Sequence, residues 1–73
     1  MNTITIKGIT YNIERAETPE VIEAKGHINT ARHMRENNVS RYMIIRRQNG
    51  KKLYWTNEFV TKHGTTYSQP FSI

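Results

Sequence analysis

The stretch SRYMIIRRQNGKKLYWTNEF, residues 40–59, sets Asn49-Gly50 between two runs that are rich in apolar and aromatic residues. Asn and Gly both tolerate positive φ, so this pair is the strongest short signal for a β-hairpin. We expect strands over residues 39–47 and 51–59, joined by a two-residue type I′ turn. This hairpin is the element from which the rest of the fold is inferred.

A two-residue turn fixes the register, because Gln48 then pairs with Lys51 and each following pair moves one residue along both strands. Side chains alternate between the two faces of such a ribbon. One face is expected to pack on a helix, and it carries Tyr42, Ile44, Leu53 and Trp55, with Arg46 near the turn. The other face is expected to point outward, with Arg47 and Lys52 exposed at the turn, and it carries Arg41, Met43, Ile45, Arg47, Lys52, Tyr54 and Thr56.

Upstream, apolar and polar residues alternate on both sides of Lys7-Gly8, which predicts a first hairpin with a tight turn. A helix start follows at Thr18 and Pro19, because threonine accepts hydrogen bonds from free helix amides and proline suits the first helical position. Apolar residues then recur at steps of three and four, which favours one helix as far as Asn37.

A break at Gly26, with Asn29 capping a second helix, is the alternative, because glycine inside a helix costs only about 1 kcal/mol. At the far end, Asn37-Asn38 is expected to supply a left-handed cap. The single helix is expected to bury Val21, Ala24, Ile28 and Ala31 against Ile4, Ile6, Ile44 and Trp55.

The last segment has turn residues around Gly64, a candidate strand near Thr65–Ser68 and a tail after Pro70. The sequence thus predicts one small α+β domain over residues 1–73. Its expected order is ββαββ with an optional short C-terminal strand, and its helix packs on one face of an antiparallel sheet.

The net charge of +5 is unevenly placed. Residues 1–25 carry three basic residues and four glutamates, whereas residues 26–73 carry eight basic residues and two glutamates. Such asymmetry favours a polyanionic partner. There is no cysteine, no secretory signal pattern and no apolar run of membrane-spanning length, so a reducing cytoplasm without membrane association is the expected location.

The leading hypothesis is a non-enzymatic basic module that binds nucleic acid through the second hairpin. A base is expected to stack on Tyr54 while cations contact phosphates. The predicted contact residues are Arg41, Arg46, Arg47, Lys51, Lys52 and Tyr54, with Arg32 and Arg35 from the helix end.

The alternative is a protein-interaction module that docks on an acidic partner, and the size also suggests an accessory protein of a phage or mobile element. A chain of 73 residues supplies a small core, so a homodimer formed through an unpaired strand edge is expected as well.

The sequence contains no recognisable pattern for catalysis or metal binding. No GxSxG, HExxH or P-loop pattern occurs, and the chain has no aspartate. His27 and His33 are six residues apart and so do not share a helix face, while Glu23 and His27 are more simply a surface pair. We therefore expect no catalytic residue, no metal and no cofactor.

Overall fold

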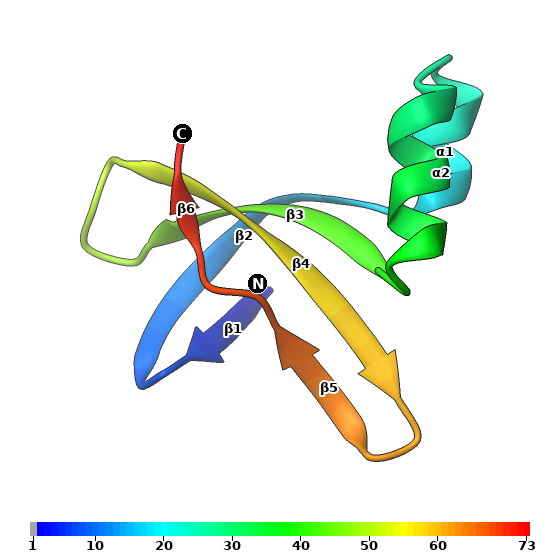
Figure 1. Cartoon of the computed structure of the whole chain (residues 1–73). Helices are drawn as coiled ribbons and strands as arrows, with labels where there is room; N and C mark the ends of the chain where they lie inside the picture. Colours follow the sequence, from blue (N-terminus) through cyan, green and yellow to red (C-terminus); the bar gives the residue numbers. More distant parts are fainter. Residues whose placement is uncertain (1) are drawn as a thin grey trace.

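The computed structural model describes residues 2–73 and shows an α+β fold built on one antiparallel sheet. The strands β1 to β5 lie side by side in chain order, and a short β6 pairs with β4 beyond the end of β5 (Figure 1). Two short helices connect β2 to β3. The elements are β1 (Thr3–Ile6), β2 (Ile9–Glu17), α1 (Pro19–Ala24), α2 (Ile28–Glu36), β3 (Arg41–Arg47), β4 (Leu53–Thr61), β5 (Gly64–Tyr67) and β6 (Phe71–Ser72).

The predicted register of the second hairpin is confirmed. Arg46 pairs with Leu53 and Ile44 pairs with Trp55, as the sequence indicates. The predicted type I′ turn at Asn49-Gly50 is wrong, because neither residue has a positive φ. The amide of Gly50 instead donates to the carbonyl of Arg47 (3.0 Å), so the turn is centred one residue earlier.

The tight turn of the first hairpin is confirmed. Lys7 and Gly8 both have positive φ, at 51° and 83°, and they separate the paired residues Ile6 and Ile9. Positive φ at both central positions is what a type I′ turn requires. The turn expected at the second hairpin is therefore found at the first.

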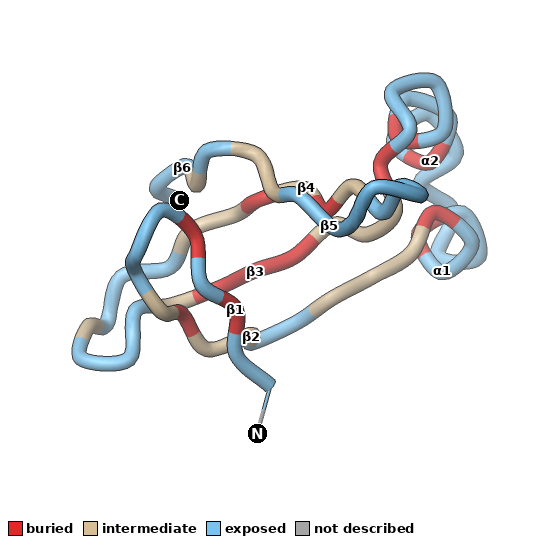
Figure 2. The backbone as a smooth tube through the Cα atoms, turned by 90° about the horizontal axis from the view of Figure 1, so that it is seen from below, coloured by how far each residue is buried: buried red, intermediate tan, exposed pale blue. Residues whose placement is uncertain are grey.

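The assignment of the hairpin faces is only partly correct. On the face predicted to pack on the helix, Ile44 is buried and Tyr42 packs against the helical cluster, but the opposite face does not point outward as predicted. Met43, Ile45 and Thr56, which were expected to point outward, are fully buried. They form the core of the inner face of the sheet with Ile4, Ile6 and Tyr11, and the partly buried residues packed around them are Ile13, Ala16, Tyr54 and Tyr67. Figure 2 shows this buried line running along β3.

The sheet curls around this inner face. The register of β2 shifts between Ile13 and Arg15, which leaves Glu14 as an extra residue of the kind that bends a strand. At the other side, the Thr56 hydroxyl donates to the carbonyl of Ser68 (2.7 Å) and so satisfies a buried polar group next to the break between β5 and β6. Tyr67 of β5 packs against the same cluster as Ile4 and Ile6 of β1, at the other end of the strand order, so the inner face is the concave one.

The prediction of one continuous helix is wrong, and the break at Gly26 is correct. Gly26 adopts a φ of 92°, and its amide donates to Glu23 (2.9 Å) while the His27 amide donates to Ile22 (3.1 Å). This pair of bonds is a Schellman motif, which ends a helix. His27 rather than Asn29 occupies the cap position of α2.

The start of α1 and the end of α2 agree with prediction. The Thr18 hydroxyl accepts from the Val21 amide (3.4 Å), and Pro19 is the first helical residue. Asn38 has a φ of 59°, and the Val39 amide donates to Met34 (2.9 Å) in a second Schellman motif.

The predicted set of buried helix residues is wrong at three of its four positions. Val21, Ala24 and Ile28 are exposed and only Ala31 is buried, because the break at Gly26 rotates α2 relative to α1. The helices pack at one end of the sheet rather than across a face. Their apolar cluster is Ile22, Ala31, Met34 and Val39, covered by Tyr42 and Phe59 and distinct from the Ile4 and Ile6 core.

The C-terminal segment contains the expected strand as β5 and one more strand than expected. Pro70 interrupts the edge, and Phe71 then pairs with Trp55. This β6 returns the chain to the β3–β4 loop, at the end of the sheet away from the helices (Figure 1).

Candidate nucleic-acid interface

Four cations lie at the end of the sheet opposite the helices, and we call this group the cationic end. Lys7 comes from the β1–β2 turn, and Arg47, Lys51 and Lys52 come from the β3–β4 loop. The chain alternates direction along the sheet, so these two turns lie at one end while the helices connect β2 to β3 at the other (Figure 1).

The two turns border a shared hollow. Residues 8–10 line one side of it and residues 47–50 line the other, around an open volume of about 590 Å³. Lys7 also reaches across to the last part of the chain, where its amino group donates to the Gln69 side chain (2.9 Å). This contact is with a neutral group and leaves the charge of Lys7 uncompensated.

None of the four cations forms a salt bridge within residues 2–73, in contrast to most charges elsewhere. Five of the six glutamates contact an arginine or lysine away from the cationic end. The net charge of +5 is therefore concentrated at this end by pairing, beyond what the sequence positions alone indicate.

Arg41 does not belong to the cationic end. It lies at the helical end of β3, where its guanidinium makes two hydrogen bonds of 2.8 and 2.9 Å to Glu58. Glu58 is only 6% exposed. The hydrogen bonds from Arg41 hold the pKa of Glu58 below its ordinary value of 4.5, against the opposing effect of burial.

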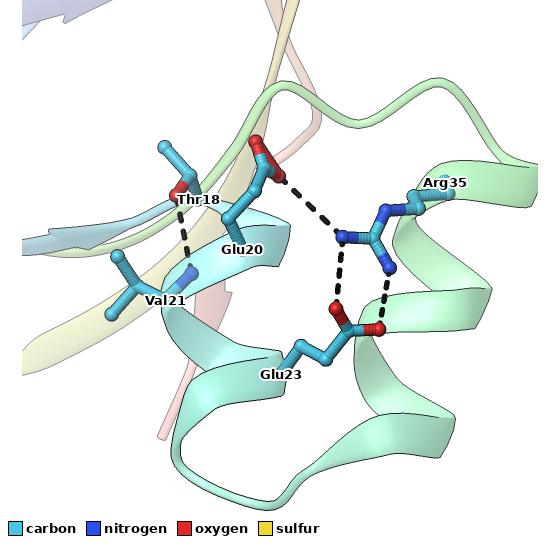
Figure 3. A network of polar contacts seen from close by, with 5 residues as sticks. All are labelled: Thr18, Glu20, Val21, Glu23 and Arg35. Carbon is cyan, nitrogen blue, oxygen red and sulfur yellow. Dashed lines mark hydrogen bonds and ion pairs between the residues drawn. The ribbon is translucent and has the colours of Figure 1, made fainter.

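Arg35 is also occupied, in the contact between the two helices. Its guanidinium lies 2.9 Å from Glu23 and 3.8 Å from Glu20, both on α1 (Figure 3). Hydrogen bonding to Arg35 lowers the pKa of the Glu23 carboxyl. Arg35 thus connects α2 to α1 through Glu20 and Glu23.

The remaining predicted cations divide between the two ends. Arg46 projects from the outer face and contacts Glu14 at 3.3 Å. Arg32 is exposed on α2 and has no carboxylate contact within the described residues. Of the eight predicted residues, only Arg47, Lys51, Lys52 and Tyr54 lie together.

Tyr54 has a different environment from the one expected. It belongs to the inner face and packs edge-to-face on Tyr11, with ring centroids 6.0 Å apart. Arg47 and Lys52 lie over its ring at 5.7 and 5.8 Å. The ring therefore supports two cations at the hairpin tip, and cation–π attraction of this kind favours their placement.

Two features were missed by the sequence reasoning. Lys7 was assigned only to a turn, although antiparallel strands in chain order bring the first and third connections to one end. The second feature is a row of aromatic rings on the outer face, Tyr42, Trp55 and Phe71, whereas the sequence predicts Tyr42 and Trp55 against the helix and Phe71 in the tail. The pairing of Phe71 with Trp55 depends on β6, which has no local sequence signal.

No cluster of histidine and carboxylate side chains suited to a metal ion exists among residues 2–73. Neither α1 nor α2 has the length and apolar character needed to cross a membrane. Comparison with protein-family models, with curated proteins and with solved structures found no match to this chain.

Proposed function

We propose that the protein is a small non-enzymatic module that binds nucleic acid through its cationic end. The observation that carries this proposal is the concentration of unpaired charge. Within residues 2–73, Lys7, Arg47, Lys51 and Lys52 lie on two adjacent turns without a carboxylate partner, while cations elsewhere are largely paired.

Polyphosphates suit such a group because binding releases the counterions that surround the nucleic acid, and each neutralised phosphate adds to this effect. Arg47 lines the hollow between the two turns, and Lys7, Lys51 and Lys52 lie on the same two turns, so the positive charge gathers around one opening. The flexible lysines are point charges rather than base readers, so the expected recognition is by charge and weakly dependent on base sequence.

The experiment is a titration of fluorescently labelled DNA and RNA, duplex and single-stranded, at several salt concentrations. Affinity is expected to fall steeply with salt. The double variant Lys51→Gln/Lys52→Gln should make the slope of log K against log salt for a duplex shallower by up to about 1.8, because each lost contact contributes about 0.9.

A matched control removes two unpaired cations from the rest of the protein. Arg32→Gln/Lys62→Gln carries the same net charge as the first variant but leaves the cationic end intact. Its slope should stay close to that of the wild type. Equal effects of the two double variants would contradict a localised site, and absence of binding at low salt would contradict the function.

A second candidate is docking on an acidic protein surface, and the observation favouring it is the apolar area beside the cations. Leu53, Phe71 and Ile73 are exposed near the same end. Exposed apolar residues gathered on one face are typical of interaction sites. A protein that binds no nucleic acid at low salt but retains an acidic protein partner on pull-down would establish this candidate instead.

Self-association also stays a prediction. The free edge at β5 carries Thr65, Thr66 and Tyr67 and no charged residue, so it lacks the lysines that commonly block strand pairing. A homodimer would pair two such edges. Sedimentation equilibrium at micromolar concentration should show a species above 8.6 kDa, and a single species of that mass would contradict it.

A further inference from the structure

The outer face of the sheet carries three aromatic rings in a row. Tyr42 stacks on Trp55 with ring centroids 6.1 Å apart and planes inclined by 16°, and Trp55 stacks on Phe71 at 5.2 Å and 22°. The three come from β3, β4 and β6, which the hairpin register and the β4–β6 pairing place side by side. The row therefore crosses the sheet to its edge.

The two ends of this row differ in access. At one end Tyr42 packs against the helical cluster and shares a hollow of about 340 Å³ with His33 and Met34 of α2. At the other end Phe71 lies on β6, which pairs with β4 on one side and with no strand of the described chain on the other. Phe71 is 55% exposed, so the row of rings is open to solvent at this end.

The surroundings of Phe71 are apolar and cationic. Leu53 and Ile73 are exposed beside it, and the Ile73 amide bonds to the Leu53 carbonyl (3.1 Å). Gln69, two residues before Phe71, is held by Lys7 of the cationic end. No acidic residue occurs in residues 59–73.

We propose that this face binds a single strand of nucleic acid, with one base stacking on the open side of Phe71 and the adjacent phosphates reaching the cationic end. This inference rests on the proposed function and adds the form of nucleic acid and the stacking residue. A flat base extends the row of parallel rings and covers apolar surface that otherwise faces water.

Single strands are selected because their bases are free to leave the stack. In a duplex the base faces are already covered by neighbouring base pairs, so no base is free to stack on Phe71. The phosphates of both forms can still contact the cations. Duplex binding therefore uses the cationic end alone, and single-strand binding uses the cationic end and Phe71 together.

The experiment uses the intrinsic fluorescence of Trp55, the only tryptophan of the chain, which contacts Phe71. Oligo(dT) and a duplex of equal length are titrated separately at one low salt concentration, and affinity is also measured with labelled strands. Oligo(dT) should change the emission of Trp55, because a base joins its stack. The duplex should bind with little change in emission.

Three variants test the role of the ring. Phe71→Leu keeps an apolar side chain and removes the ring. Affinity for oligo(dT) should therefore fall by about 5- to 150-fold, the change in affinity that corresponds to the loss of one stacked base. Duplex affinity should stay within about twofold of wild type. Phe71→Tyr keeps the ring and should keep the single-strand affinity. Val60→Ser alters another exposed apolar residue, outside the row, and should change neither.

The outcomes separate the two proposals. If Phe71→Leu binds oligo(dT) like wild type, or if duplex and single strand change Trp55 emission equally, the stacking inference is overturned while binding by the cationic end stands. If wild type binds neither form at low salt, both proposals fail. If Phe71→Leu does not fold, loss of single-strand binding in the folded Phe71→Tyr variant overturns the inference.

Discussion

The two ends of the sheet differ in whether their basic residues have carboxylate partners. At the helical end, arginines are held by glutamates from neighbouring elements, as in Arg41 with Glu58 and Arg35 with Glu23. At the cationic end, Lys7, Arg47, Lys51 and Lys52 have no such partners within the described chain. A basic residue therefore indicates a binding site only when no carboxylate of the same chain neutralises it.

The largest expected effect concerns the pair at the helical end. Glu58→Gln leaves the Arg41 guanidinium without its negative partner at a nearly buried position. We expect a loss of about 1–3 kcal/mol in the free energy of unfolding, less than for a fully buried pair because the Arg41 side chain is 38% exposed. Urea denaturation at neutral pH measures it.

The matched variant is Glu20→Gln, which removes an exposed carboxylate from a longer contact with Arg35. Its cost should stay below about 0.5 kcal/mol, as for other surface pairs. Equal losses in the two variants would contradict the distinction between a buried structural pair and a surface one.

The Arg41–Glu58 pair also predicts that the free energy of unfolding depends on pH. Because the pKa of Glu58 is lowered on folding, mainly by hydrogen bonds from Arg41, the folded state binds this proton less tightly than the unfolded state. The contribution of the pair is thus fully present above the unfolded value of 4.5 and is lost as pH falls through the folded value.

Urea midpoints measured from pH 7 down to pH 3 should therefore fall less steeply on the acid side in Glu58→Gln than in the wild type. The cationic end contains no carboxylate, so Lys51→Gln/Lys52→Gln should keep the acid-side slope of the wild type. Identical acid-side profiles for Glu58→Gln and the wild type would show that Glu58 does not contribute.

A smaller effect distinguishes the backbone of the two ends. Gly26 has a φ of 92° at the end of α1, whereas Gly50 in the β3–β4 loop has no positive φ. Gly26→Ala should cost about 1–2 kcal/mol, because a Cβ disfavours the left-handed region. Gly50→Ala should cost less than about 0.5 kcal/mol, since its Cβ would meet the Cβ of Arg47 at an ordinary 3.5 Å.

Thermal unfolding of both variants checks this pair of values. A larger loss in Gly50→Ala than in Gly26→Ala would mean that the hairpin tip depends on a left-handed residue after all. It would then restore the type I′ turn that the Asn-Gly pair predicts.

Much of the fold could be predicted from local signals. The register of the second hairpin, the turn at Lys7-Gly8 and the caps at Thr18 and Asn38 each depend on residues close in sequence, and all are observed. The break at Gly26 remained open because the cost of a mid-helix glycine is about the size of the competing cap preference.

The inner and outer faces of the hairpin could not be assigned because both carry apolar residues. Met43 and Ile45 are buried by Ile4 and Ile6 of β1, and Trp55 is covered by Phe71 of β6. These contacts join segments far apart in the sequence, and no local pattern encodes which of them forms. Alternation shows that two faces exist but does not show which one becomes the core.

The candidate site could be predicted only in part, because some of its contacts follow from the hairpin register and others depend on the tertiary arrangement. The predicted register already sets Glu58 opposite Arg41, so this pair could have been recognised from the sequence. The pairing of Arg35 with Glu23 requires the two helices to lie antiparallel, which follows only once the break at Gly26 is known. Lys7 joins the site through the order of the strands.

Binding at the cationic end and Phe71 is tested most directly by following the backbone amide chemical shifts of the protein while a single-stranded oligonucleotide is added at low salt. The largest changes should fall at residues 7–8, 47–52, 69 and 71–73, with α1 and α2 nearly unaffected. Changes centred on α2 around Arg32, with the two turns and β6 unchanged, would contradict it.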